Sequence, residues 1–440
     1  MSSNRYTSVR GAIGPRFYEG DMMEKKSRAA LMAGAALFGF AAALAPTPAL
    51  AQSSAPGSSA SGLEEVIVTA RKSEERAKDV PVSITALSGA TLQAVSAGGA
   101  DISFLSARVP SVNVESSFGR TFPRFYIRGL GNTDFDLNAS QPVSLVYDEV
   151  VFENPVLKGF PAFDVERIEV LRGPQGTLFG RNTPAGIVKF DSVKPTEEFG
   201  GYVRGGYRSF NGFDLEGAVG GKIAEGLSAR ASLLVQTQDE WIDNAATNQK
   251  DFTGDYQDIA ARLQLRWQPN EKLDALLNVH GRSFDGTSQI FRANVITRGT
   301  TGLNANFDRD RVFYDGGAGN NQELDTLGVT GRIVYDFGNV VMTSVTGYEN
   351  VEFYGRGDID GGAGAAFLPT GSRPGVIPFP AESADGIDSL DQWSQELRFA
   401  SDAGGAVTWL AGLYYFSEDT TISTFNFDTF APGQPRNGFA

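Results

Sequence analysis

The stretch LSARASLLVQTQD, from Leu227 to Asp239, alternates between apolar and polar side chains. Leucine, alanine and valine fill the odd-numbered positions from 227 to 235, and serine, arginine or glutamine fills positions 228, 230, 232, 236 and 238. Successive side chains of a β-strand point to opposite faces, so the pattern predicts a strand with one apolar and one polar face. Strands of about 9 to 11 residues with such faces are typical of a barrel that crosses a membrane around a wet interior.

The alternation recurs along the C-terminal half of the chain, and about nine such strands are expected between Gly200 and Phe416. The clearest repeats are YQDIAARLQLRWQP (256–269), LDALLNVHGRSF (273–284), TLGVTGRIVYDF (326–337), DQWSQELRFAS (391–401) and VTWLAGLYYF (407–416). Short turns are expected at 224–226, 269–272, 338–339 and 402–405, and longer connections at 239–255, 284–324 and 352–391. Because outer-membrane barrels place short turns in the periplasm and long loops outside, this asymmetry favours them over a soluble β-sandwich or propeller.

The composition limits the function classes. The chain has 440 residues with 52 glycines and 11% aromatic residues, which suits many short strands joined by tight turns. Its net charge of -14 argues against nucleic-acid binding, which needs basic surfaces. With no cysteine and one histidine, His280 on an expected strand, neither a thiolate metal site nor a Ser/His/Asp catalytic set is expected. Asp358 and Asp360 could form a general acid and base pair, but in a glycine-rich loop such acids are more often solvated turn residues.

The N-terminus has the three parts of a secretory signal peptide. They are basic residues at 25, 26 and 28, an apolar run at 29–45, and Ala-Leu-Ala at 49–51. Cleavage is expected after Ala51, and a membrane anchor is the less favoured alternative because the apolar run is short. The basic residues lie far from Met1, which suggests that translation begins at Met22 or Met23. Residues 1–51 are therefore interpreted as leader and signal peptide.

Residues 52–63 form a Ser/Ala/Gly linker, and residues 64–70 then read EEVIVTA, a β-branched run beside two acids. No strand-prone neighbour adjoins this run, so it is a candidate to add a strand to the sheet edge of another protein. An ordinary first strand of the next domain is the alternative. Residues 71–195 follow as a mixed segment of short strands and a short helix. Its loops SSFGRTFP (116–123) and GNTDFDLNASQP (131–142) have the composition of binding loops.

A glycine-rich stretch, VERIEVLRGPQGTLFGRNTPAG (165–186), lies near the end of the mixed segment. A glycine-rich turn after a strand is also found in phosphate-binding loops. Here no Lys-Ser/Thr pair follows the glycines, Pro174 removes an N–H donor, and no amphipathic helix is expected after the turn. The stretch is therefore not interpreted as a phosphate site.

These segments together resemble the TonB-dependent outer-membrane receptors. EEVIVTA resembles the TonB box, and SQELRFAS (394–401) is similar to a frequent barrel motif. The plug domain is resembled by RFYIRGLG (124–131), VYDEV (146–150) and the glycine-rich stretch. The resemblance implies a mainly β fold: a 22-stranded type of transmembrane β-barrel, partly present at 196–440, with an N-terminal α+β plug, residues 71–195, in its lumen.

The resemblance also implies partners and site residues. The periplasmic TonB protein would bind the box at Glu65, Val66, Ile67, Val68, Thr69 and Ala70. A small-molecule or chelate ligand would bind at the plug apices, at Phe118, Arg120, Phe122, Asn132, Asp134, Phe135 and Asn138. The plug arginines Arg128 and Arg172 would pair with the lumen-facing Glu396 and Glu216. No cofactor or metal is expected, and the protein would be a monomer in the lipid of the outer membrane of a Gram-negative cell.

The function that this implies is TonB-dependent import of a scarce, bulky nutrient. A ferric siderophore is the first candidate, because a chain with so few metal-binding side chains would have to receive iron already chelated. A carbohydrate or another organic substrate is the alternative. A passive porin or an exported enzyme is less favoured, because a diffusion pore has no use for a plug. Because about nine strands cannot close a barrel, the sequence is expected to be a fragment or a truncated gene product.

Overall fold

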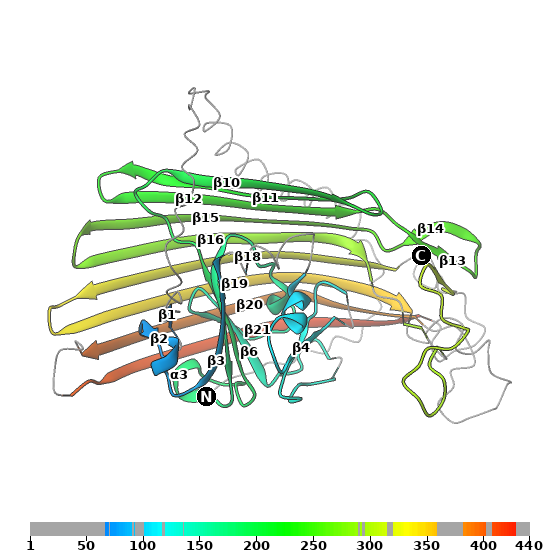
Figure 1. Cartoon of the computed structure of the whole chain (residues 1–440), viewed down its shortest axis with the longest axis horizontal. Coiled ribbons are helices and arrows are strands. Elements are labelled where there is room, and N and C mark those ends of the chain that lie inside the picture. The colour runs from blue at the N-terminus through cyan, green and yellow to red at the C-terminus, as the bar shows by residue number, and fades with distance from the viewer. Residues whose placement is uncertain are drawn as a thin grey trace, which may run out of the picture.

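A computed structural model of the chain describes residues 67–69, 71–89, 92, 101–116, 119–134, 136–288, 291–292, 295–314, 320–358, 382–401 and 407–427. Within these residues the chain forms one large sheet and a smaller unit packed against one of its faces (Figure 1). We call the smaller unit the plug. Among the described residues, no helix has the length and apolar character needed to span a bilayer.

The large sheet has nine antiparallel strands in sequence order, which confirms the expected number. They are β10 (Gly200–Arg208), β11 (Gly212–Ala224), β12 (Leu227–Gln238), β15 (Tyr256–Asn270), β16 (Leu273–Thr287), β18 (Asn321–Asp336), β19 (Val340–Asp358), β20 (Glu382–Ser401) and β21 (Leu410–Phe427). Within this part of the chain, β10 and β21 each have a single neighbour in the sheet.

The turns between these strands follow the predicted asymmetry. Short connections join β11 to β12, β15 to β16 and β18 to β19, at the positions expected from the sequence. The strands from β15 onward are longer than the expected 9 to 11 residues, and β20 has 20. They extend toward the long connections, where residues 239–255 and 288–320 also contribute a small separate sheet. Its strands are β13 (Ile242–Asn244), β14 (Gln249–Thr253) and β17 (Arg311–Val312).

The two faces of the large sheet are those that the alternation predicted. On β15 the polar Asp258, Arg262 and Gln264 are buried against the plug, whereas Leu263 and Trp267 on the other face are about half exposed. A soluble protein would bury the apolar face instead. The apolar face is therefore the one that suits lipid, and the polar face lines the lumen.

The plug contains a mixed five-stranded sheet in the order β3-β8-β9-β6-β7. Its strands are β3 (Ser83–Ser88), β6 (Val143–Tyr147), β7 (Val150–Phe152), β8 (Val165–Arg172) and β9 (Gly186–Ser192). Two further strand pairs are β1 (Ile67–Val68) with β2 (Glu75–Arg76), and β4 (Val112–Glu115) with β5 (Arg124–Ile127). The helical turns are η1 (Ala77–Asp79), η2 (Ile102–Ala107), η3 (Leu157–Gly159) and α3 (Gly176–Phe179).

The glycine-rich stretch between β8 and β9 shows why glycine is needed there. Gly186 opens β9 with a φ of 143°, and a Cβ at this position would lie 2.2 Å from the backbone oxygen of Leu171. Only a residue without a side chain can approach the neighbouring strand so closely. The stretch therefore serves packing inside the plug, and α3 within it is a single turn of four residues.

The plug core continues into the barrel wall. Aromatic residues of the plug, Tyr147, Phe152 and Phe160, surround the ring of His280, with ring centroids 5.1 to 6.4 Å away. His280 is 4% exposed on β16 and lies 3.2 Å from a carboxylate oxygen of Glu349. The histidine thus lines the lumen against the plug, as its place on a strand indicated.

Candidate functional site

The described part of the box motif is docked on the plug. Ile67 and Val68 form β1, which pairs with Arg76 and Glu75 of β2. The prediction that this run has no partner nearby is therefore wrong; its partner is the polar pair at 75–76, which the apolar pattern did not reveal. Val68 is fully buried in an apolar cluster on one face of the plug sheet. Glu65, Val66 and Ala70 lie outside the described residues.

Polar contacts also hold the end of β1. The backbone N–H of Thr69 donates to Oε1 of Glu169 at 2.8 Å, and the Lys189 ammonium donates to the Thr69 hydroxyl. Glu169 and Lys189 are both buried, on β8 and β9. The described part of the box therefore rests on β8 and β9, two of the three inner strands of the plug sheet.

The two plug arginines that were expected to pair with barrel glutamates do not do so. Arg128 is exposed, and its backbone N–H donates to Ser111. Arg172 donates to the backbone oxygen of Pro110 and to the hydroxyl of Thr85, both within the plug. Arg172 lies at the end of β8 beside β3, which directs its side chain across its own sheet. Both pairings predicted for these arginines are wrong.

The two barrel glutamates do contact the plug, through other groups. Oε2 of Glu396 accepts from the Lys72 ammonium at 2.9 Å, and its Oε1 lies 3.1 Å from Arg398. Oε1 of Glu216 accepts from the backbone N–H of Asp164 at 3.1 Å and from Arg204 of β10 at 2.7 Å. The alternation correctly placed both glutamates in the lumen, whereas the identity of their partners depends on the tertiary fold.

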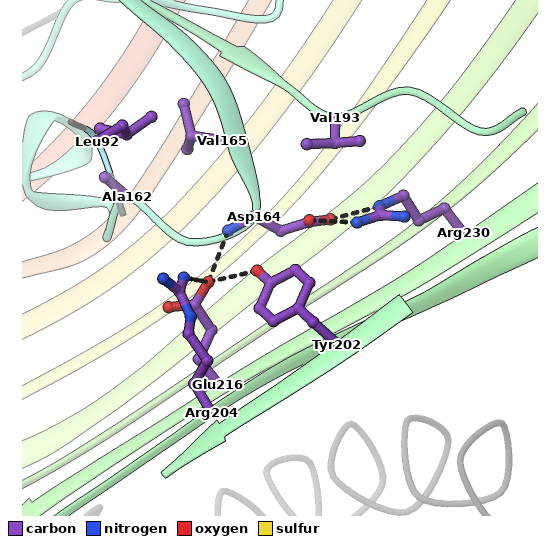
Figure 2. Close-up of a pocket in the computed structure, with 9 residues that line it drawn as sticks. All are labelled: Leu92, Ala162, Asp164, Val165, Val193, Tyr202, Arg204, Glu216 and Arg230. Carbon is purple, nitrogen blue, oxygen red and sulfur yellow. Dashed lines mark hydrogen bonds and ion pairs between the residues drawn. The ribbon is translucent and has the colours of Figure 1, made fainter. Parts of the chain in front are cut away.

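Another plug–barrel contact has the opposite polarity, with the carboxylate on the plug. Asp164, just before β8, accepts two hydrogen bonds from the Arg230 guanidinium of β12, at 2.7 and 2.5 Å (Figure 2). The hydroxyl of Ser232 donates to the same carboxylate, which is 1% exposed. A planar guanidinium facing a carboxylate through two parallel hydrogen bonds is the most specific form of ion pair. Asp164 therefore fixes the plug against β12.

A cavity of ≈320 Å³ lies beside this contact, between the plug and β10 to β12. Its plug side is apolar except for Asp164, and its barrel side carries charged and hydroxyl groups (Figure 2). The lining residues are Leu92, Ala162, Asp164, Val165, Val193, Tyr202, Arg204, Glu216 and Arg230. The space thus lies on the boundary between the two units, next to the ion pair that joins them.

A second anchor is the tight turn between β6 and β7. Asp148 and Glu149 form the turn with φ values of 45° and 73°, a left-handed conformation that non-glycine residues seldom adopt. Lys194, Ser192 and Asn278 surround the Asp148 carboxylate. Burial alone would raise the pKa of Asp148, but Lys194 and Arg262 outweigh it and lower that pKa.

Glu149 joins the same turn to two further barrel strands. Arg332 of β18 donates to its Oε1 at 2.6 Å, and Arg398 of β20 donates to Oε2. Burial raises the pKa of Glu149, but Arg398, Arg332 and Lys72 together lower it to about 2. The carboxylate is therefore charged throughout the physiological range. Because Lys72 follows the box by two residues, this cluster also connects the box region to the barrel.

The predicted ligand residues at the plug apices have different environments. Arg120 lies at the lumen wall, where it donates to Gln236 at 2.5 Å and stacks 4.3 Å from the Tyr256 ring centroid. Phe122 is 1% exposed in the plug core, so its assignment as a ligand contact is wrong in this conformation: an aromatic side chain in this loop completes the core.

The other apex loop is polar and accessible. Asn132, Asp134 and Asn138 are partly or fully exposed, and Asn132 accepts from the N–H of Asp134 while donating to Ser140. Phe118 and Phe135 lie outside the described residues. The structure therefore leaves Arg120 and the 132–138 loop as candidates for ligand contact. Of the two acids weighed as catalytic, Asp358 ends β19 and is 1% exposed instead of solvated, and Asp360 lies outside the described residues.

Sequence reasoning missed Asp148, Glu149 and Asp164 as anchors, although all three lie in or directly beside motifs it had singled out. Asp148 and Glu149 are the acids of VYDEV, and Asp164 directly precedes VERIEV. Acidic residues in a tight turn are usually solvated, so the turn composition alone gave no sign of a buried role. The available signal was the set of arginines on the lumen face of the barrel strands. These arginines require carboxylate partners, and the plug is one possible source of them.

Comparisons with known proteins agree with this architecture. Residues 76–187 match the model of the TonB-dependent receptor plug domain. The pesticin receptor of Yersinia pestis is 29% identical over 209 residues, which are 47% of this chain and 30% of that protein. The pesticin receptor of Yersinia enterocolitica is also 29% identical, over 227 residues. The chain thus spans about a third of the length of these curated relatives.

Solved receptors share the fold over a larger part of the chain. The ferric yersiniabactin uptake receptor FyuA from Yersinia pestis superposes with a TM-score of 0.64 at 22% identity, covering 78% of this chain and 50% of that one. The pyoverdine outer membrane receptor FpvA from Pseudomonas aeruginosa gives a TM-score of 0.63 at 14% identity, covering 84% and 51%. The chain therefore carries a TonB-dependent receptor plug domain at residues 76–187, and this plug with the nine-stranded wall beside it has the fold of the solved receptors.

Proposed function

We propose that the protein of which this chain forms at least a part imports a ferric siderophore across the outer membrane, driven by the periplasmic TonB protein. The observation that carries the proposal is the plug itself: a domain matching the family model occupies the lumen side of the sheet, with the box strand resting on its inner strands. Moving a plug that is held to the barrel wall by the contacts described above would require an energy input.

The names of similar proteins support iron as the cargo. FyuA is described as an uptake receptor for ferric yersiniabactin, and FpvA as a pyoverdine receptor. Among the described residues, no three His, Cys, Asp or Glu side chains gather as a metal site. The accessible 132–138 loop and Arg120 are the proposed first contacts for that chelate.

The experiment that tests this function uses cells that carry or lack the intact gene. Growth under iron limitation is compared while different ferric chelates are supplied, and uptake of ⁵⁵Fe is measured with each one. A defect confined to one chelate supports the proposal and identifies the ligand. If the gene makes no difference with any chelate, iron import is wrong, and a carbohydrate or another organic substrate becomes the better candidate.

Deletion of residues 64–70 tests the energy coupling separately. A TonB-dependent importer without its box should still bind ligand at the cell surface but should no longer take it up. A passive porin should be unaffected by the same deletion. A variant of matched length, with part of the linker at 52–63 removed, controls for shortening of the N-terminal segment.

An enzyme is the least supported alternative. The solved proteins that share the fold are described as receptors, and Asp358, one member of the acid pair considered above, is buried at the end of a barrel strand. We propose further that the protein resides as a monomer in outer-membrane lipid, with the apolar face of the large sheet toward the acyl chains. Size analysis of the detergent-solubilised receptor tests the oligomeric state.

A further inference from the structure

The lumen wall of the barrel is rich in arginine on the side of β10 to β16. Five arginines of these strands carry the contacts described below: Arg204, Arg230, Arg262, Arg266 and Arg282. Each guanidinium is permanently charged, so each needs compensation when it is buried. The source of that compensation divides the arginines into two kinds.

Three of the five have a carboxylate partner on the barrel itself. Arg204 pairs with Glu216 at 2.7 Å, Arg266 with Asp274 at 2.7 Å, and Arg282 with Asp258 at 2.8 Å. These pairs lie on neighbouring strands and therefore stay together whatever the plug does. They belong to the wall.

Arg230 is compensated by the plug. Its guanidinium forms the paired hydrogen bonds with Asp164 described above and is 13% exposed. The neighbouring lumen residue Ser232 donates to the same carboxylate. Within the described residues, we find no barrel carboxylate in contact with Arg230. Movement of Asp164 would therefore leave this charge alone in the lumen.

Arg262 depends on the plug even more strongly. It lies close to Arg230, because Arg262 of β15 is directly opposite Ser232 of β12, which is two residues along the strand from Arg230. Its guanidinium donates hydrogen bonds to neutral oxygens of the plug: the backbone oxygens of Phe163 and Asp164, both at 3.4 Å, and the Tyr147 hydroxyl. Its charge also favours the ionised form of Asp148, which is likewise a plug residue. The side chain is 3% exposed, and its Nε–H has no acceptor among the described residues. A buried guanidinium with an unused N–H donor can bind a further anionic group.

The cavity of ≈320 Å³ provides space for such a group. It borders Arg230 and Asp164 (Figure 2). The backbone oxygen of Asp164 also accepts from Arg262, at 3.4 Å. Above it, toward the long connections, Arg120 of the plug and Arg208 of β10 flank the Tyr256 ring at 4.3 and 5.5 Å. Basic groups therefore continue from the outer end of this wall to the cavity.

We propose that Arg230 and Arg262 form an anion-binding site on the path of the imported ligand, and that the Asp164 carboxylate occupies this site while the plug is closed. When the plug moves, negatively charged oxygens of the ligand replace its carboxylate. Exchange of one anion for another avoids leaving two guanidiniums uncompensated in a confined space, which would be costly. A neutral or cationic ligand could not make this exchange. The inference rests on the proposed import function and narrows the cargo to anionic chelates.

The test uses the full-length receptor in cells and two ⁵⁵Fe probes, for which the inference predicts opposite import results. One is a ferric tricatecholate, with a metal centre that carries three negative charges, and the other is a ferric trihydroxamate, with a neutral centre. The wild-type receptor should import the first and not the second. In the variant Arg230→Gln/Arg262→Gln, surface binding of the tricatecholate should persist while its import falls about tenfold or more, since only a later step is affected.

Three further variants separate this role from a structural one. Arg230→Lys/Arg262→Lys retains the charge and should restore much of the import. Asp164→Asn removes the plug carboxylate but leaves both arginines, so import should continue; if Arg230 served only to hold the plug, this variant would fail as badly as the glutamine variant. Arg266→Gln is the matched control, because Arg266 lies on β15 with Arg262 but pairs with Asp274 of the barrel. This variant should import normally. Retained surface binding shows that each variant is folded.

Other outcomes overturn the inference. Unchanged import by the double glutamine variant would show that the ligand does not use these arginines, as would failure of the lysine variant to restore import. Wild-type import of the trihydroxamate alone would contradict an anionic cargo while leaving iron uptake intact. Wild-type cells that import neither probe, nor any other ferric chelate, would overturn the proposed function and this inference together.

Discussion

The first part of the plug, residues 67–116, and its second part, residues 119–194, differ in how they contact the barrel. The first part reaches the wall through Lys72, whose ammonium lies 2.9 Å from Glu396. The second part meets it through Arg120, Glu149 and Asp164, and through backbone groups such as Gly159, whose oxygen accepts from Arg282 at 2.8 Å. Within the described residues, the anchors are concentrated in the second part.

The position of β3 reinforces the difference. It is an edge strand of the plug sheet with β8 as its single neighbour, whereas β8, β9 and β6 each have two. It is also the sheet strand nearest the box along the chain. A force applied at the box would thus act first on β1 and β3, which are held weakly to the barrel. We expect the β6–β7 turn of the second part to remain in place, so that a path opens beside it, while the segment at Asp164 yields its place on Arg230 to the ligand.

The largest effect on import is expected from an engineered disulfide that holds the first part of the plug, compared with one that holds the second part. The chain has no cysteine, so paired substitutions introduce a single bond. Ser83→Cys with Arg172→Cys joins β3 to β8 across a directly opposed pair. If β3 must leave the sheet, this bond should reduce import to background, and a reducing agent should restore it. Import of the labelled chelate is the measurement.

The matched control joins the second part of the plug to the barrel. A Cβ at Gly347 of β19 would lie 2.8 Å from both methyl carbons of Val150, so Val150→Cys with Gly347→Cys can form a bond without a large backbone shift. Import should persist in this variant when oxidised. A block by both disulfides would show that the whole plug moves, and a block by neither would show that β3 stays in its sheet.

The anchors themselves can be weakened one at a time, and Glu149 should have the largest individual effect. Glu149→Ala leaves Arg332 and Arg398 without their shared carboxylate in the lumen. Loss of one partner of a buried pair destabilises by about 3 to 5 kcal/mol, and the partial exposure of Arg332 favours the lower end. Hydrogen exchange of the β6 and β7 amides in the purified receptor should accelerate accordingly. Glu75→Ala, at an exposed pair with Arg71, should change exchange little.

The sequence was sufficient to predict the barrel wall because the surroundings impose two opposite faces on each strand. The alternation of YQDIAARLQLRWQP assigned Arg262 to the lumen and Trp267 to the outer face, and both are found there. The turns were equally predictable, since glycine and polar residues interrupt the pattern at 224–226 and 338–339. These features depend on local chemistry, which a single sequence displays.

The pairings across the plug–barrel boundary could not be predicted in the same way. Arg172 and Glu396 are both where the motifs placed them, yet they are not partners, because the approach of one unit to the other decides which charges meet. The Asp164 anchor depends on a turn with a φ of 49° before β8, and its partner lies 66 residues away in the sequence. No periodic pattern records such a contact.

A smaller effect is expected from the Lys72 anchor of the first part. Lys72→Ala removes an ammonium that is paired with Glu396 and lies 4.7 Å from the Phe179 ring centroid. Hydrogen bonds to charged groups contribute about 1.5 to 3 kcal/mol, so proteolysis near residues 67–76 should become correspondingly faster. Exchange in β6 and β7 should not change. If it accelerated as much as in Glu149→Ala, the two parts of the plug would be coupled and the comparison would fail.

The smallest effect concerns the pH dependence of the second part. The pKa of Glu149 is about 2 in the folded receptor and ordinarily 4.5. A carboxyl group with a lowered pKa adds stability that is fully present above its ordinary pKa and is lost as the pH falls toward the folded value. Between pH 8 and 6 its contribution should therefore be constant, and at pH 4 it should have fallen by roughly 1 kcal/mol.

Other plug carboxylates respond to acid as well, so the contribution of Glu149 must be taken as a difference. The isosteric Glu149→Gln variant cannot titrate at this position and should lose less stability than the wild type between pH 6 and pH 4. Exchange of the β6 and β7 amides at each pH measures both proteins. Equal losses would mean that Arg332 and Arg398 do not hold the carboxylate in its charged form, and that burial of the turn, more than its charge, fixes the second part of the plug to the barrel.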